Sequence, residues 1–192
     1  MSLESIVHDV LQQKLNDYGI VDEELQWFQS YLLDRQQFVY AHDVMSNEAV
    51  LNIGVPQGSV LGPTLFMLYV NDISQFVSLS TCNLYADDTV IYCCGRDLYD
   101  LETKLQSSVL EVSKWYKAND LSLNSDKSNV PVVTSRYMNC DNTINITLDN
   151  QMLKQVEVAD YLGVKIDESF SWDLYVNKLC ASLGCHIASF LD

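Results

Sequence analysis

The chain has 192 residues, 48% of them hydrophobic, and a formal net charge of −15 at pH 7. This length and hydrophobic fraction indicate one globular domain, or one with a small appendage, that buries a real core. No run approaches the roughly 18 apolar residues of a membrane span, and the acidic balance argues against unaided binding to a nucleic-acid backbone.

The six cysteines contain no Cys-x-x-Cys pair, and no signal peptide opens the chain. Both features favour a reducing, intracellular compartment, either nucleus or cytoplasm. Cys180, Cys185 and His186 could form a metal corner, but we favour a buried thiol pair on a helix.

Periodicity predicts two amphipathic helices near the start, over residues 5–18 and from Asp22 to about Arg35. Two strands follow, 37–41 and 49–53, as a hairpin across a polar loop. A Gly- and Pro-rich loop at 54–63 leads into a helix that is apolar almost all round and should be buried. Next comes a hairpin with Tyr85-Ala86-Asp87-Asp88 at its turn.

The second half opens with the longest helical pattern, residues 97–119. The later strands are predicted at 130–134, 144–148, 153–158 and 161–166, and a terminal helix at 171–191. Helices and antiparallel strands mix without regular βαβ alternation, so the predicted fold class is α+β.

Asp87 and Asp88 sit between two runs of β-branched and aromatic residues. Carboxylates in an apolar hairpin lose hydration unless a positive charge compensates, and oxygen ligands suit Mg²⁺. From these four residues alone, a plain Asp-containing turn is the favoured explanation of the pair.

The flanking blocks decide between these two interpretations. The ordered motifs are Val55-Pro56-Gln57-Gly58-Ser59-Val60-Leu61-Gly62-Pro63, Tyr69-Val70-Asn71-Asp72-Ile73, Tyr85-Ala86-Asp87-Asp88-Thr89, Leu123-Asn124-x-x-Lys127 and Tyr161-Leu162-Gly163-Val164. Over nearly the whole chain this set resembles the reverse transcriptase domain of non-LTR, LINE-like retrotransposons. The resemblance implies the palm of a right-hand polymerase, a ferredoxin-like antiparallel sheet with helices on one face.

The resemblance also implies site residues for RNA-directed DNA synthesis. Asp87 would bind metal, and Asp88 would be the weaker or outer carboxylate of a site that holds two Mg²⁺ ions in an intact family member. Tyr85 would pack near the primer end, although ordinary strand packing explains it equally well. Lys127 would stand near the triphosphate, or be a solvated charge.

Pro56, Gln57 and Gly58 would lie where the incoming nucleotide meets the template, although turn geometry alone can also explain Gly58. The resemblance makes 161–167 a largely structural primer-grip strand. Trp115 is expected in the core rather than at a contact. The implied partners are an RNA template, a DNA primer and dNTPs, with no membrane.

The chain also departs from the family pattern. The family's first metal-binding aspartate would fall before Met1, and the fingers and thumb are absent, so residues 1–192 are expected to be a truncated, incomplete palm. One weakly held Mg²⁺, no primer extension and doubtful nucleic-acid binding are therefore expected of the isolated chain. The alternatives are a non-catalytic remnant and a domesticated palm that acts as an interaction module.

Overall fold

A computed structural model describes residues 3–56, 58–86, 88–134 and 143–189, with side chains as far as residue 183. The chain forms two compact units. Unit 1 comprises Met1–Cys94 and Ser107–Leu123, and unit 2 comprises Gly95–Gln106 and Asn124–Asp192. Each unit is described by itself, and helix α4 runs through both.

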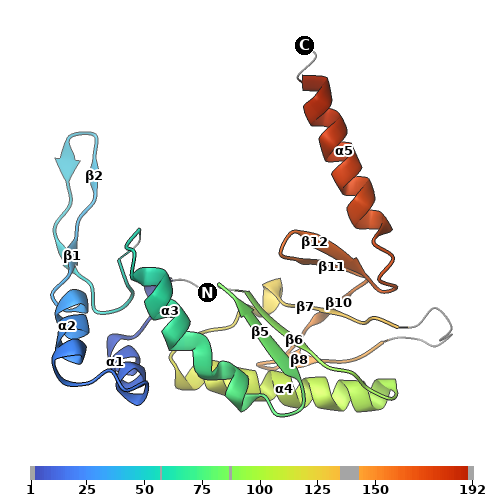
Figure 1. The fold of residues 1–192 in the computed structure, drawn as a ribbon, viewed down its shortest axis with the longest axis horizontal. Coiled ribbons are helices and arrows are strands. Elements are labelled where there is room, and N and C mark those ends of the chain that lie inside the picture. Colours follow the sequence, from blue (N-terminus) through green and yellow to red (C-terminus); the bar gives the residue numbers. More distant parts are fainter. Residues whose placement is uncertain (1–2, 57, 87, 135–142, 190–192) are drawn as a thin grey trace. The chain divides into compact units, whose positions relative to one another are not determined.

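Unit 1 contains three helices, short 3₁₀ turns and three small hairpin ladders (Figure 1). Its elements are η1 (Leu3–Ser5), α1 (His8–Asp17), α2 (Asp22–Leu32), β1 (Gln36–Gln37), β2 (Tyr40–Ala41), β3 (Val44–Met45), β4 (Ala49–Val50), α3 (Gly62–Val70), η2 (Asn71–Phe76), β5 (Thr81–Tyr85), β6 (Asp88–Tyr92) and the second half of α4 (Leu98–Ala118). The predicted helices, the Gly- and Pro-rich loop and the Asp88 hairpin are confirmed.

Unit 2 contains the first half of α4, short strands and the terminal helix (Figure 1). Its other elements are η3 (Ser125–Lys127), β7 (Asn129–Pro131), β8 (Thr147–Leu148), β9 (Gln151–Met152), β10 (Lys154–Val156), β11 (Val158–Tyr161), β12 (Val164–Asp167) and α5 (Asp173–Ser189). Between Thr143 and Leu148 exposed and buried residues alternate, as the period of a half-buried extended segment requires.

The core of unit 1 is built from the apolar faces of α1, α3 and α4 together with the inner face of β5 and β6. Leu11, Leu15, Leu65 and Tyr69 are completely buried. Trp115 is 3% exposed, so its predicted core position is confirmed. Burial of such side chains stabilises each position by roughly 1.5–3 kcal/mol relative to exposure.

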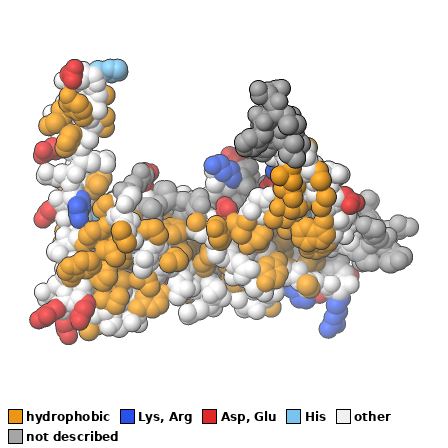
Figure 2. Space-filling view, turned by 45° about the horizontal axis from the view of Figure 1, so that its top comes forward, with side chains coloured by type: hydrophobic (Ala, Val, Ile, Leu, Met, Phe, Trp, Pro, Cys, Tyr) orange, Lys and Arg blue, Asp and Glu red, His pale blue; other side chains and the backbone are white. Residues whose placement is uncertain are grey.

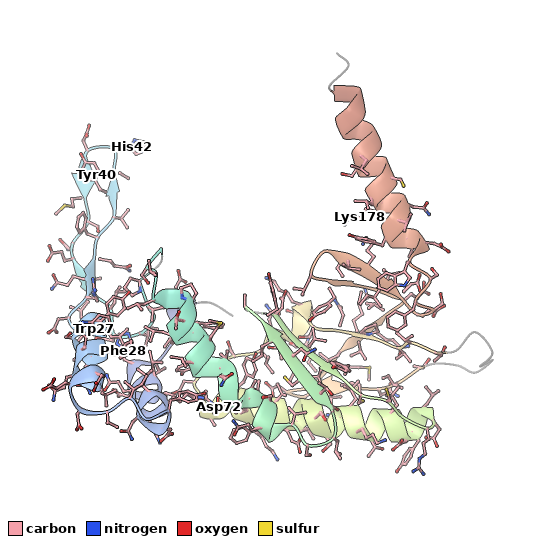
Figure 3. All side chains as sticks on the ribbon, viewed as in Figure 1. Trp27, Phe28, Tyr40, His42, Asp72 and Lys178 are labelled. Carbon is pink, nitrogen blue, oxygen red and sulfur yellow. The ribbon has the colours of Figure 1, made fainter. Side chains whose placement is uncertain are left out.

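One charged side chain enters this core. The ammonium group of Lys14 donates to a carboxylate oxygen of Asp72 at 2.6 Å. The same nitrogen lies 4.7 Å from the ring centroid of Trp115 and 5.4 Å from that of Tyr69. Asp72 stands just after the end of α3 (Figure 3). Lys14 therefore joins α1, α3 and α4 at one point.

The predicted hairpin after α2 is present, but its loop is shorter than the sequence indicates. β1 pairs with β4, and β2 pairs with β3 across His42 and Asp43. Both turn residues have positive φ, 50° and 61°, the signature of a tight type I′ turn. Val44 and Met45 are therefore strand, not loop. Figures 2 and 3 show hydrophobic side chains along this arm and Tyr40 and His42 near its end.

Two strand predictions in unit 2 are wrong in detail. The segment 153–158 divides, because β10 pairs in parallel with β7 while β11 begins at Val158. The expected primer-grip strand near 161–167 is instead half of a hairpin. Its turn lies at Leu162 and Gly163, with φ of 51° and 83°, values that an extended strand excludes.

The terminal helix is confirmed as α5, but Cys180 on it is exposed rather than buried. Val176 and Leu179 on this helix, and Phe170 and Trp172 just before it, are also about half exposed. No described helix is long and apolar enough to cross a membrane. The α+β class is confirmed.

The connection between β12 and α5 is tied together by one carboxylate. Asp167 accepts hydrogen bonds from the backbone and hydroxyl groups of both Ser169 and Ser171. These donors stabilise the ionised form, the bonds from Ser171 most strongly, and lower the pKa of Asp167 from its ordinary 3.8 to about 2.

The Lys14 contacts predict a stability change. Lys14→Met keeps the apolar stem but leaves the half-buried Asp72 without its cation, and we expect unit 1 to lose about 2 kcal/mol of unfolding free energy. Urea unfolding followed by tryptophan fluorescence measures this loss. The matched control is Lys114→Met on the exposed side of α4. An equal loss in both variants would contradict the role of the cation.

Asp167 predicts a pH dependence. Its pKa is lower in the folded chain, so the unfolded chain binds more protons between pH 3.8 and 2. The stability that Asp167 adds is complete above this window and disappears as the pH falls through it. We expect the urea midpoints of wild type and Asp167→Asn to converge as the pH falls from 5 to 2. Glu168→Gln removes a neighbouring charge without touching the serines, and its difference from wild type should not follow this course.

Candidate functional site

Asp88, the second aspartate of the sequence motif, opens β6 beside the turn of a tight hairpin. β5 and β6 pair in antiparallel register, with Tyr85 opposite Asp88 as the last pair. Ala86 lies in the turn, and Asp87 lies outside the described residues. The predicted position of the motif between two strands is confirmed.

Strand alternation places the side chains of this hairpin on two different faces. Cys82, Leu84 and Ile91 pack against the core of unit 1. Tyr85 and Asp88 belong to the opposite face, and both are exposed. Side chains of directly opposed residues lie close together, so the carboxylate of Asp88 has the Tyr85 ring as its neighbour.

The turn is held in an uncommon backbone conformation. Ala86 has a φ of 50°, in the left-handed region that costs a residue with a Cβ about 1 kcal/mol or more. Glycine would occupy this region without that cost. The chain therefore retains a mildly strained residue directly beside its carboxylates, and such residues cluster at functional sites.

Hydrogen bonds fasten the hairpin and its approach segment to α4. Ser78 donates from its backbone and hydroxyl groups to Glu111, at 3.1 and 2.8 Å. The hydroxyl groups of Ser80 and Ser108 lie 2.7 Å apart, as do those of Thr89 and Tyr116. Figure 1 shows β5 and β6 along α4.

Burial also shifts the acidity of two groups at this contact. Desolvation raises the pKa of the Tyr116 hydroxyl, while its hydrogen bond to Thr89 acts in the opposite direction. Desolvation likewise raises the pKa of the Cys82 thiol. Both groups therefore remain neutral at physiological pH, and the inner face of the hairpin carries no charge at either position.

The Pro56 loop belongs to the same unit and is fixed at its start. The backbone N–H of Gly54 donates to the carbonyl of Ile6 at 2.7 Å, and the carbonyl of Gly54 lies 2.7 Å from Nε2 of the buried His8. A Cβ on Gly54 would meet the backbone of Glu4 at 2.9 Å, so only glycine fits there.

Gly58 has a different reason to be glycine. Its φ is 76°, and the Ser59 N–H donates to the Pro56 carbonyl across the turn. Type II turns need such a positive φ at their third position. Nothing lies within 4 Å of a Cβ built on Gly58, so the turn requires glycine while the space above it is open. Gln57, between these residues, lies outside the described residues.

Lys127 lies in unit 2, in the short helix η3, and its side chain is exposed. Its backbone N–H donates to the Asn124 side chain at 3.2 Å, so the Asn-x-x-Lys spacing forms a cap. Of the residues predicted for the site, Tyr85 and Asp88 are therefore brought together. Pro56 and Gly58 share their unit, and Lys127 does not.

The carboxylate of Asp88 suits a divalent cation as a single oxygen donor, because it is exposed and none of the hydrogen bonds and ion pairs of the described residues involves it. The described part of the chain contains no group of three or more His, Cys, Asp or Glu residues that could hold a metal. Asp88 offers one carboxylate at this hairpin, and a metal site there would need further donors.

Comparison with known proteins identifies the family. The model for "Reverse transcriptase (RNA-dependent DNA polymerase)" matches residues 4–166. This chain belongs to the reverse transcriptase family. The resemblance seen in the sequence is thus confirmed, and the matched range includes the hairpin, the Pro56 loop and Lys127.

The similar proteins are polymerases of mobile elements. The chain is 31% identical over 163 residues to the "Probable RNA-directed DNA polymerase from transposon X-element" of Drosophila melanogaster, covering 83% of this chain and 18% of that protein. It is 22% identical over 166 residues to the "RNA-directed DNA polymerase from mobile element jockey" of the same organism, with the same two coverages.

A third similarity is to the "Retrovirus-related Pol polyprotein from type-1 retrotransposable element R1 2" of Nasonia vitripennis, 24% identical over 132 residues, or 66% of this chain and 32% of that protein. The chain thus spans about a fifth of the length of the Drosophila relatives. The remnant and interaction-module alternatives are not favoured by these matches.

Sequence reasoning missed three features of the site. They are the buried hydroxyl of Tyr116, its hydrogen bond to Thr89, and the positive φ of Ala86. Alternation along β6 could have shown that Thr89 and Asp88 face opposite sides. No sequence signal pairs Thr89 with Tyr116.

The strain at Ala86 gives a testable prediction. Ala86→Gly should raise the unfolding free energy by roughly 0.5–1 kcal/mol, since glycine adopts positive φ without steric cost. Ala86→Val should lower it by about 1–2 kcal/mol, because a β-branched residue is strained there. Thermal unfolding of both variants measures the two changes. A stabilising Ala86→Val would show that the turn does not have this geometry.

Proposed function

We propose that this chain is the palm part of an RNA-directed DNA polymerase of a non-LTR retrotransposon, with Asp87 and Asp88 at its metal-binding turn. The observation that supports this most directly is the exposed pairing of Tyr85 with Asp88 at the end of a hairpin whose other face is packed into the core. The match to the reverse transcriptase family supports a role for that arrangement in nucleotide transfer.

In the proposed reaction a primer 3′ hydroxyl attacks the α-phosphorus of a dNTP, and pyrophosphate leaves. Mg²⁺ held by Asp87 and Asp88 would stabilise the charge that develops on the attacking and leaving oxygens. Asp88 would bind the metal from the outer face of β6, and Tyr85, opposite it, would offer an aromatic surface to the primer end. The core-packed inner face keeps these two side chains turned outward.

The other assignments concern the substrates. We assign Pro56, Gln57 and Gly58 to the nucleotide and template, because Gly58 combines a positive φ with open space where a base or sugar can approach. We assign Lys127 to the triphosphate, because its exposed ammonium can stabilise the charge of departing pyrophosphate. The hairpin 158–167 is assigned to the primer grip, as two strands and a turn.

The charge of the chain constrains how it meets nucleic acid. With 26 acidic and 11 basic residues, long-range repulsion opposes an RNA or DNA backbone. Divalent cations at Asp87 and Asp88 would reduce this repulsion locally, where the reaction takes place. Binding of template and primer should therefore depend on Mg²⁺ more steeply than in a basic polymerase.

The proposal predicts the effect of one substitution. Asp88→Asn keeps the shape of the side chain but removes its charge, so Mn²⁺ binding to the 192-residue chain, followed by electron paramagnetic resonance, should weaken at least about tenfold. DNA synthesis on a primed RNA template by a polymerase that contains these residues should fall at least about 100-fold.

The matched control is Asp160→Asn, which removes an exposed carboxylate at the surface of unit 2 whose partner among the described residues is Lys165. It should change neither Mn²⁺ affinity nor synthesis. Equal Mn²⁺ binding by wild type and Asp88→Asn would contradict the metal-binding role of the hairpin.

A further inference from the structure

We propose that Thr89 and Tyr116 are positioning residues whose hydrogen bond sets the direction in which Asp88 presents its carboxylate. This inference rests on the proposed metal-binding function of the hairpin. It assigns neither residue a contact with metal or substrate. Both act through the backbone of β6.

The hydrogen bond is short and sheltered. The Thr89 and Tyr116 hydroxyl oxygens are 2.7 Å apart, and Tyr116 is only 2% exposed. The Tyr116 ring packs edge-on against Trp115, with centroids 5.3 Å apart and planes at 74°. Trp115 lies in turn beneath the Lys14 ammonium. The ring that carries the hydroxyl is thus held on a rigid part of unit 1.

Thr89 is well placed to act on Asp88. It is the next residue along β6, and its partner across the hairpin is Leu84 on the inner face. Consecutive side chains of a strand point to opposite faces. A bond that fixes the inward direction of Thr89 therefore fixes the outward direction of Asp88.

A second hydrogen bond, Ser80 to Ser108, turns this contact into a two-point attachment. Ser108 and Tyr116 are eight residues apart on α4, about 12 Å along a helix. Ser80 lies in the bend just before β5, four residues before Leu84, the partner of Thr89, and four residues of extended chain span at most about 14 Å. These spans match, so both bonds form when the hairpin lies along the helix. Without the Thr89–Tyr116 bond, the hydrogen bonds to α4 that the structure describes lie at the base of the hairpin, at Ser78 and Ser80, far from its turn.

The turn end of the β5–β6 hairpin needs these hydrogen bonds to α4. Within the described residues, β5 and β6 pair only with each other. An isolated two-stranded hairpin is marginally stable in water. Its turn also contains Ala86 at positive φ, which the surrounding contacts must hold in place. The Thr89–Tyr116 bond is the attachment to α4 nearest that turn, among those that the structure describes.

The experiment removes one hydroxyl at a time. Tyr116→Phe and Thr89→Val each delete a partner while retaining shape, and Thr89→Ser retains the hydroxyl. The matched control is Tyr31→Phe, because the buried Tyr31 hydroxyl has no hydrogen-bond partner among the described residues. The 192-residue chain is used, with Mn²⁺ dissociation constants measured well below the unfolding temperature.

We expect Tyr116→Phe and Thr89→Val each to weaken Mn²⁺ binding about fivefold, and the double variant to weaken it no further, because both remove the same bond. Thr89→Ser and Tyr31→Phe should bind Mn²⁺ as wild type does. An unchanged Mn²⁺ affinity in Tyr116→Phe overturns the proposal, even if its unfolding midpoint falls, because a merely structural bond predicts that result.

A second measurement separates this inference from the proposed function. If wild type shows no Mn²⁺ binding that depends on Asp87 or Asp88, the metal-binding function fails. Hydrogen exchange of the segment 81–92 then decides whether the bond positions the tip. Exchange about fivefold faster in Tyr116→Phe than in Tyr31→Phe supports the positioning role, and equal exchange overturns it.

Discussion

The burial of one ammonium group constrains the whole of unit 1. Lys14 must find compensation for lost water, and the Asp72 carboxylate and the faces of Tyr69 and Trp115 provide it. Those three residues come from the end of α3 and from α4. The position of α1 is thereby tied to the helix on which the Asp88 hairpin lies. Apolar packing alone would tolerate small slides between these helices, whereas a charge with fixed partners does not.

Much of the fold could be predicted because long elements repeat their signal many times. The apolar positions of α4 recur over 21 residues, and the predicted bounds differ from the observed ones by one residue at each end. Short strands gave no such redundancy. The turn at Leu162 and Gly163 interrupts a run of Tyr, Val and Ile that looks continuous, because Leu rarely adopts positive φ. The pairing of β10 with β7 joins segments 25 residues apart and has no local signature.

The candidate site likewise has features that the sequence predicts and features that it does not. The identity of Asp88 and its place on a hairpin follow from four residues and their neighbours, and its exposure follows from strand alternation. The contacts that orient Asp88 cannot be predicted from these nearby residues. Thr89 and Tyr116 are 27 positions apart, and Lys14 and Asp72 are 58 apart. A motif contains the reactive side chains, but the residues that orient them are distant in sequence and come together only when the chain folds.

The alternation of β6 has a consequence for how such sequences decay. Insertion or loss of one residue between Ser80 and Tyr85 would exchange the two faces of the strands, because side chains alternate with a period of two. The carboxylate would then point toward the buried Tyr116 ring, and an apolar side chain would face water. Alignment to relatives would hardly register the change, since every motif letter would survive with a single gap. In mobile elements that accumulate small insertions and deletions, the spacing between the base of this hairpin and its aspartates is therefore a sharper mark of an intact site than the aspartates themselves.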